Sequence, residues 1–181
     1  MIIVMGVPGV GKSSVLDGVK RLKSEYKIIN YGDLMLGIFK EKYRLQNRDE
    51  IRRASIVQQK AVQKAVALKL SKMSGKTVLD THCSIQTANG YLPGLPFDLL
   101  KKLKVERLIL ISAPIDEIYQ RRKNDITRTR EVSKEEMVEH EKINYAYLAA
   151  YSAFCGAPAS IILNCNHKLQ EAIKKIASFL D

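Results

Sequence analysis

The chain is predicted to form a three-layer α/β/α fold around a five-stranded parallel sheet, and three observations support this. Five short apolar runs alternate with segments whose apolar residues have helical spacing, the pattern of parallel sheets covered on both faces. The run Arg107–Ser112 (RLILIS) is apolar nearly throughout, as strands buried on both faces are. A glycine-rich turn joins the first run directly to the first helical segment. With 181 residues and 46% hydrophobic content, residues 1–181 are expected to form one domain.

The elements are assigned in chain order from apolar spacing. The expected strands are Met1–Met5, Tyr26–Asn30, Thr77–Asp80, Arg107–Ser112 and Ser160–Asn164. The expected helices are Ser14–Ser24, Leu34 to about Tyr43, a long helix that ends before Gly75, Asp98–Leu103, Ile115–Asn124, Ser133 to about Phe154, and Lys168–Leu180. Thr81–Pro96, which is rich in Gly, Pro and Thr, is expected to be a loop.

Local signals refine the helix boundaries and faces. Asp33 is a candidate N-cap for the second helix, and Ser133 with Glu136 predicts a capping box for the sixth. Gly75 is a candidate C-cap of the long helix. The core-facing stripe of that helix is predicted to be Ala54, Val57, Ala61, Ala65 and Leu68.

The segment Gly6–Ser13 (GVPGVGKS) matches G-x-x-x-x-G-K-[ST], the phosphate-binding P-loop. It follows an apolar strand and opens a helix, which is the context this loop needs. Its glycines let backbone N–H groups point at a polyphosphate, and the helix N-terminus adds partial positive charge. Lys12 is expected to reach the β- and γ-phosphates, and the Ser13 hydroxyl to ligate Mg²⁺. The fold is therefore expected to be of the P-loop NTPase type, with a nucleoside triphosphate as ligand.

The remaining residues suggest what receives the phosphoryl group. The GTPase patterns N-K-x-D and D-x-x-G do not occur in the chain, which disfavours a GTPase. Transfer between two nucleotides needs several cations and exclusion of water. Two arginine clusters supply such cations: Arg48, Arg52 and Arg53 in one, and Arg121, Arg122, Arg128 and Arg130 in the other. Each arginine has the competing interpretation of a surface ion pair.

Asp80 stands at the end of the third expected strand, where it would hold a water ligand of Mg²⁺. A turn-forming aspartate is the alternative. The second arginine cluster flanks a loop expected to close over both substrates as a short lid.

Composition narrows the partners. The net charge of +11 suggests a second hypothesis, a basic P-loop ATPase associated with nucleic acid, although the lysines are dispersed along helices. The three cysteines have no metal-ligand spacing, which indicates reduced thiols and no zinc. No apolar run approaches the length of a membrane span, and no secretory signal pattern opens the chain. We therefore expect a cytoplasmic protein for which nucleic acid is at most an incidental partner.

Several motifs together resemble those of the archaeal-type adenylate kinases. These are GVPGVGKS, NYGD (Asn30–Asp33), RDEIR (Arg48–Arg52), DTH (Asp80–His82), GYLPGLP (Gly90–Pro96) and RKNDITRTR (Arg122–Arg130). They occur in the same order over nearly the whole chain. The resemblance implies reversible Mg²⁺-dependent transfer, ATP + AMP ⇌ 2 ADP, by a homotrimer. It also implies an AMP-binding part over about 31–73 and a short lid over about 122–133.

The resemblance assigns roles to individual residues. ATP would be bound by Gly6, Val7, Pro8, Gly9, Val10, Gly11, Lys12, Ser13 and Ser14. AMP would be bound by Asp33, Arg48, Arg52, Gly90 and Tyr91. The catalytic cations would be Lys12, Arg121, Arg128 and Arg130, and Mg²⁺ would be held by Ser13 and, through water, by Asp80.

Two departures from related patterns affect the acceptor side. Ile85-Gln86-Thr87 stands where some relatives carry a basic residue, so Gln86 either contacts an adenine edge or is neutral. Leu34-Met35-Leu36 follows Asp33 where the bacterial-type family has an arginine. Arg48 or Arg52 must then hold the AMP phosphate, and both remain candidates. A nucleoside-monophosphate kinase with a different acceptor base is the remaining alternative.

Overall fold

A computed structural model of the chain describes residues 1–47, 50, 54–73, 75–87, 89–125 and 133–181. Within these residues the main sheet has five parallel strands in the order β2–β3–β1–β6–β7. The strands are β1 (Ile2–Met5), β2 (Lys27–Asn30), β3 (Thr77–Thr81), β6 (Arg107–Ser112) and β7 (Ala159–Leu163). Each agrees with an expected strand to within one or two residues, which confirms the predicted fold class.

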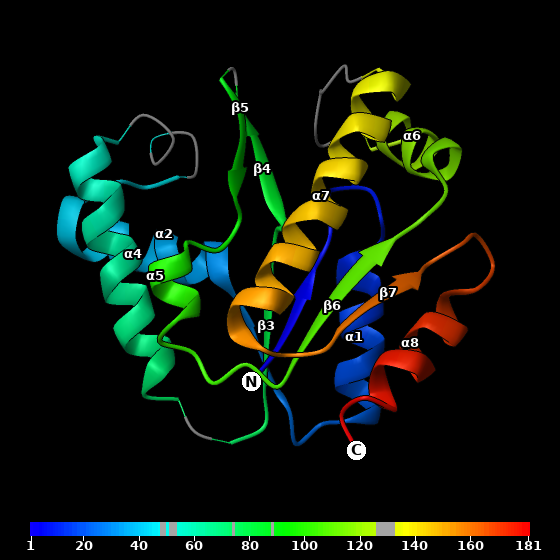
Figure 1. Ribbon diagram of the computed structural model, residues 1–181, viewed down its shortest axis with the longest axis horizontal. Helices are drawn as coiled ribbons and strands as arrows, with labels where there is room; N and C mark the ends of the chain where they lie inside the picture. The colour runs from blue at the N-terminus through cyan, green and yellow to red at the C-terminus, as the bar shows by residue number, and fades with distance from the viewer. Residues whose placement is uncertain (48–49, 51–53, 74, 88, 126–132) are drawn as a thin grey trace.

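Helices cover the sheet on both sides. They are α1 (Lys12–Leu22), α2 (Tyr31–Tyr43), α4 (Ile56–Ser71), α5 (Phe97–Leu100), α6 (Ile115–Lys123), α7 (Lys134–Cys155) and α8 (Leu169–Ala177). In Figure 1, α2, α4 and α5 gather on the left of the sheet, and α1 and α8 lie on the right. No helix in the described ranges is long and apolar enough to cross a bilayer.

The two-residue period of β1 shows how the layers form. Ile3 and Met5 belong to a core cluster with residues of α2, α4 and α7, whereas Ile2 and Val4 belong to a second cluster with α1 and α8. Successive side chains of a strand point to opposite faces. Because the strand is apolar on both faces, it needs a helical layer on each side, and this is why the chain folds into three layers.

The segment expected as a loop after β3 contains an antiparallel hairpin, β4 (Ser84–Thr87) and β5 (Gly90–Pro93). The expectation was wrong because Gly90 and Pro93 begin and end the short strand β5 instead of marking a loop. The return to the body depends on Gly94: its N–H donates to the Cys83 carbonyl at 2.9 Å. A Cβ on Gly94 would lie 1.9 Å from the His82 carbonyl oxygen, so only glycine fits without movement of the backbone.

The predicted stripe of α4 was also wrong in part. Val57 and Leu68 are 78% and 56% exposed, whereas the buried residues of α4 are Val62, Val66, Ala67 and Leu70. Both sets have helical spacing, so periodicity alone does not choose between them. The helix ends at Ser71 with Lys72 as its C-cap, so Gly75, at φ +91°, lies beyond the cap position.

Two predicted caps had different outcomes. The capping box of α7 is confirmed by two 3.1 Å hydrogen bonds between Ser133 and Glu136. For α2 the cap is Asn30 rather than Asp33, because the helix begins three residues earlier than expected and Asn30 Oδ1 accepts from the Asp33 N–H at 3.1 Å. This places Asp33 in the first turn, near the carboxyl end of β2.

Candidate active site

The P-loop lies at the carboxyl end of β1, between β3 and β6. The chain returns to opposite sides of β1 at this point, and open α/β sheets bind ligands at such a reversal of strand order. Gly9 and Gly11 adopt positive φ values of 93° and 78°, which only glycine does at no steric cost. Gly6 is needed for space instead, since its Cβ would lie 2.9 Å from the Ile111 carbonyl oxygen.

Three side chains hold alternate carbonyl groups of the P-loop from outside. His82 Nδ1 lies 3.2 Å from the Gly6 oxygen, Arg122 Nε donates to the Pro8 oxygen at 2.8 Å, and Asn164 Nδ2 donates to the Val10 oxygen at 2.8 Å. In a trans peptide the next N–H points away from the carbonyl. The N–H groups of residues 7, 9 and 11 are therefore turned away from these three side chains, as an anion-binding loop requires.

Lys12 and Asp80, predicted from separate motifs, meet in the structure. Lys12 Nζ donates to Asp80 Oδ1, and the side chains of the pair are only 12% and 11% exposed. The other carboxylate oxygen accepts from Asn30 Nδ2 at 2.7 Å. Asn30 and Asp80 are register partners on β2 and β3, which places their side chains at one edge of the sheet. A buried carboxylate is thus satisfied by one cation and one amide.

The donor set around this pair fits a magnesium ion that arrives with a nucleotide. Among the described residues no three His, Cys, Asp or Glu side chains form a metal cluster. Mg²⁺ usually binds through one or two carboxylates, waters and substrate phosphates rather than through a protein cage. The Asp80 carboxylate and the Ser13 hydroxyl in the first turn of α1 are the groups that suit this arrangement.

Arg121 makes several hydrogen bonds beside the P-loop. Its Nη2 donates to Glu117 Oε2 at 2.9 Å, to the Asn164 carbonyl at 2.9 Å and to Asn166 Oδ1 at 2.7 Å. Its Nη1 lies 3.5 Å from the Val10 carbonyl. In this arrangement Arg121 ties α6 to the P-loop and to the segment after β7. The predicted site residues Arg48, Arg52, Arg128 and Arg130, together with Arg53, lie outside the described residues.

The β4–β5 hairpin presents two different faces, set by its register. Gln86 pairs with Tyr91, and Ile85 pairs with Leu92 on the opposite face. The Tyr91 ring lies 5.0 Å from the ring of His140 on α7. Ile85 and Leu92 are 45% and 56% exposed. In the view of Figure 1 the hairpin rises between α7 on one side and α2 and α4 on the other. Because Tyr91 contacts α7, the Ile85–Leu92 pair on the opposite face of the hairpin is turned away from α7.

A buried polar group joins the hairpin to α7, and sequence reasoning missed it. Ser84 Oγ donates to Asn144 Oδ1 at 2.6 Å. His140 Nε2 lies 3.0 Å from Ser84 Oγ and must donate to it, because the Ser84 hydroxyl has only one proton to give. Burial lowers the pKa of His140. Beside it the Cys83 thiol donates to the Asn144 carbonyl, and burial raises the pKa of Cys83 to about 12.

No sequence pattern predicts the contacts of Ser84 with His140 and Asn144. His140 and Asn144 are four residues apart on α7, but their partner Ser84 is more than fifty residues away. Asn30 could have been suspected from the NYGD motif, and Asn164 from its position after an apolar strand. Their roles become visible only from the sheet register and from the packing of the P-loop against β7.

The chain is similar to known proteins over nearly its whole length. Residues 5–139 match a family model described as an AAA domain. The adenylate kinase of Thermoplasma acidophilum is 42% identical, covering 96% of this chain and 94% of its own length. That of Methanopyrus kandleri is 40% identical, covering 97% and 94%, and that of Methanothermobacter thermautotrophicus is 37% identical, covering 100% and 99%.

Solved structures support the fold. A shikimate kinase from Bacteroides thetaiotaomicron superposes with a TM-score of 0.61 at 8% identity, covering 99% of this chain and 97% of its own. A shikimate kinase from Acinetobacter baumannii in complex with shikimate gives a TM-score of 0.61 at 15% identity, covering 99% and 91%. At such low identity these likenesses concern the fold alone. The curated relatives, similar over nearly their full length, show that the chain belongs to the adenylate kinase family.

Proposed function

We propose that the protein catalyses the reversible, Mg²⁺-dependent transfer of the ATP γ-phosphoryl group to AMP, giving two ADP. One observation carries the proposal: a P-loop whose Lys12 is paired with Asp80, in a chain that belongs to the adenylate kinase family over its whole length. The family supplies the expected acceptor, and the P-loop supplies the donor site.

On the donor side, Gly6–Ser14 would bind the ATP phosphates. The N–H groups turned inward by His82, Arg122 and Asn164 are positioned to donate to phosphate oxygens without rearrangement. Lys12 would leave Asp80 for the β- and γ-phosphates when ATP binds. Mg²⁺ held by Ser13 and, through water, by Asp80 would neutralise charge on the transferred group.

On the acceptor side, the proposed AMP-binding part is about 31–73 together with the hairpin. Asp33, Gly90 and Tyr91 are the described candidates, and either Arg48 or Arg52 would hold the AMP phosphate. The exposed Ile85–Leu92 face offers an apolar surface on which a nucleobase would pack, since it is turned away from α7. Gln86 and Tyr91 lie together on the other face, which makes both weaker candidates for contact with the base.

The proposed lid is about 122–133, with Arg128 and Arg130 as cations that approach the transferred phosphoryl group when the lid closes. Closure would exclude water and so prevent hydrolysis of ATP. Arg121 is the third proposed catalytic arginine. Its bonds to the Val10 and Asn164 carbonyls are suited to hold the P-loop, and its guanidinium would have to leave Glu117 to reach a phosphate.

The test is an acceptor screen. The protein is incubated with Mg·ATP and AMP, GMP, CMP or UMP in turn, and ADP formation is followed, with an acceptor-free reaction to measure hydrolysis. Of the four acceptors, we expect only AMP to give rapid ADP formation, and we expect little ATP hydrolysis in the reaction without acceptor. Faster transfer to CMP or UMP would replace AMP by another acceptor. ATP turnover that depends on added RNA would instead favour a nucleic-acid-associated ATPase, as the net charge of +11 suggests.

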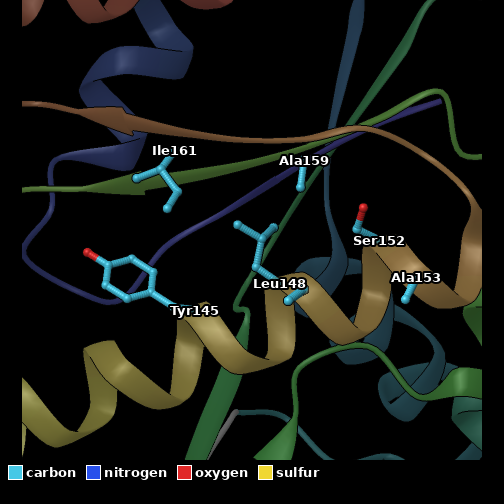
Figure 2. A pocket seen from close by; sticks show the side chains of 7 residues that line it. Tyr145, Leu148, Ser152, Ala153, Ala159 and Ile161 are labelled. Atoms are coloured by element: carbon cyan, nitrogen blue, oxygen red, sulfur yellow. The ribbon is translucent and has the colours of Figure 1, made fainter.

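We also propose that the protein is a cytoplasmic homotrimer. An open groove lies between α7 and the edge strand β7, lined by residues that include Tyr145, Leu148 and Ile161 (Figure 2). Ile161 and Leu163 on that edge are 50% and 56% exposed. An exposed apolar edge strand is a template for association with another chain, and a second copy of this chain is the proposed occupant.

A further inference from the structure

Asn30 lies in the candidate site, but neither the P-loop motif nor the name of the family assigns it a role. It stands at the carboxyl end of β2, and both ends of its side-chain amide are engaged. Oδ1 accepts from the Asp33 N–H at 3.1 Å and so caps α2. Nδ2 donates to Asp80 Oδ2 at 2.7 Å. The amide orientation is unambiguous, because an N–H can only donate and a carboxylate accepts.

The two partners of Asn30 belong to different halves of the proposed site. Asp80 faces Lys12 and the phosphates of the donor, whereas α2 begins the part proposed to bind the acceptor. The Asp80 carboxylate would otherwise be free to rotate about its side-chain bonds. With Lys12 on one oxygen and Asn30 on the other, its plane is held from two sides. When Lys12 leaves for the phosphates, the hydrogen bond from Asn30 still holds Asp80.

We propose that Asn30 is a positioning residue for phosphoryl transfer: it holds Asp80 in the orientation that receives Mg·ATP, and it ties this carboxylate to the first turn of α2. The inference rests on the proposed function for its acceptor half and on the P-loop alone for its donor half. The two tasks of Asn30, capping α2 and orienting Asp80, are separable. A shorter cap residue accepts from the helix N–H without reaching the Asp80 carboxylate.

Three substitutions separate these two tasks. Asn30→Ser keeps an N-cap oxygen but loses the donor to Asp80. Asn30→Ala loses both. Asn30→Asp keeps the cap and places a second carboxylate beside Asp80, where it competes for the Lys12 ammonium. The matched control is Ile176→Val, which removes one methyl group from a fully buried position in the core between the sheet and α8.

Two readouts are measured for each variant: kcat and KM with Mg·ATP and AMP, and calorimetric ATP affinity with and without Mg²⁺. Thermal unfolding reports the structural effect. We expect Asn30→Ser to unfold near the wild-type temperature while kcat falls about tenfold or more, the effect of a lost hydrogen bond to a charged group. The gain in ATP affinity that Mg²⁺ provides should shrink as well. Asn30→Asp should lose at least as much activity, and Asn30→Ala should also unfold at a lower temperature.

The inference is overturned if Asn30→Ser retains kcat and the Mg²⁺-dependent gain within twofold of wild type. It is also overturned if activity falls only in step with unfolding temperature, as in Ile176→Val. If the wild-type protein forms no ADP from AMP but the Mg²⁺-dependent gain is reduced in Asn30→Ser, the proposed acceptor is wrong and the positioning of Asp80 stands.

Discussion

At the scale of single residues, the polar and charged groups of the site are paired with one another in the protein without ligand. The buried Lys12–Asp80 pair avoids an isolated charge, and Asn30 completes the hydrogen bonding of Asp80. His82, Arg122 and Asn164 do the same for P-loop carbonyls. Binding of a polyphosphate therefore gives Lys12 a new partner and leaves the contacts to the P-loop carbonyls in place, which keeps the cost of rearrangement low.

Replacement of the P-loop lysine should abolish most activity without unfolding the protein. In Lys12→Ala we expect kcat to fall by about two to three orders of magnitude, because a preorganised cation no longer stabilises the transferred charge. Steady-state kinetics and circular dichroism measure the two effects. Lys20→Ala, in the last turn of the same helix, is the control and should keep full activity. Near-normal turnover in Lys12→Ala would remove this residue from the mechanism.

His140 should make stability sensitive to acid. Its pKa is lowered in the folded protein, chiefly by burial, so below the ordinary value of 6.5 the unfolded chain binds protons that the folded one does not. The free energy of unfolding should thus decrease as pH falls below 6.5. His140→Gln keeps an N–H donor for Ser84 and should lose part of that decrease. Urea unfolding at pH 7 and pH 5 compares the two proteins, and identical pH dependence would contradict the assignment.

At the scale of elements, the β4–β5 hairpin is the feature that local rules missed. Gly94 closes the hairpin by a hydrogen bond to the Cys83 carbonyl, and Ser84 and Tyr91 contact α7. Its length and its glycines look like a loop, and only pairing with itself and with α7 makes it a structural element. Local rules also missed the start of α2. The helix begins after Asn30, whose side chain is held by a hydrogen bond to Asp80 on the neighbouring strand β3.

Gly94→Ala should destabilise the protein by about 3 kcal/mol or more, because the added Cβ overlaps the His82 backbone and cannot be relieved by a side-chain rotation. Gly37→Ala is a matched control in the exposed middle of α2, where a Cβ meets nothing within 4 Å. It should stabilise by about 0.5–1 kcal/mol. Denaturant unfolding measures both, and equal stability of the two variants would contradict the close packing at Gly94.

The apolar face of the hairpin should affect the acceptor and not the donor. In Ile85→Ala and Leu92→Ala we expect KM for AMP to rise several-fold while KM for ATP stays within twofold, because apolar surface is removed only beside the proposed base site. Leu22→Ala, another exposed leucine at the end of α1, is the control. A parallel rise in both KM values would place this face away from the acceptor.

At the scale of the whole molecule, the sheet order gathers motifs from distant parts of the chain. β1 lies between β3 and β6, so the P-loop, Asp80 and the segment before α6 meet at one edge. Among the described residues no such gathering of motifs occurs at the edge strand β7, where Ile161 and Leu163 are exposed. The first edge is the proposed ligand site, and the second is the surface proposed to bind another copy of the chain.

The proposed self-association through β7 has a direct test. The wild-type protein is expected to sediment as a trimer at micromolar concentration, and Ile161→Lys to shift it toward monomer, because a charge on the apolar edge opposes pairing. Sedimentation velocity or light scattering gives the mass. Lys69→Ala, exposed in the last turn of α4 on the other side of the sheet, is the control. A monomeric wild type would contradict the trimer, and an unaffected trimer in Ile161→Lys would place the interface elsewhere.

The sequence by itself determined the strand and helix alternation, the P-loop and the position of Asp80 at the end of a strand, whereas the pairing of Lys12 with Asp80 became visible only in the structure. These features are local: apolar spacing, glycine positions and motif residues act over a few neighbours. Only the tertiary structure decided that Asn30 bridges Asp80 and α2, that the segment after β3 is a hairpin, and which face of α4 is buried. Those outcomes depend on register and on contacts across more than fifty residues in several cases, where the free energy of packing, not local propensity, selects between patterns that fit the sequence equally well.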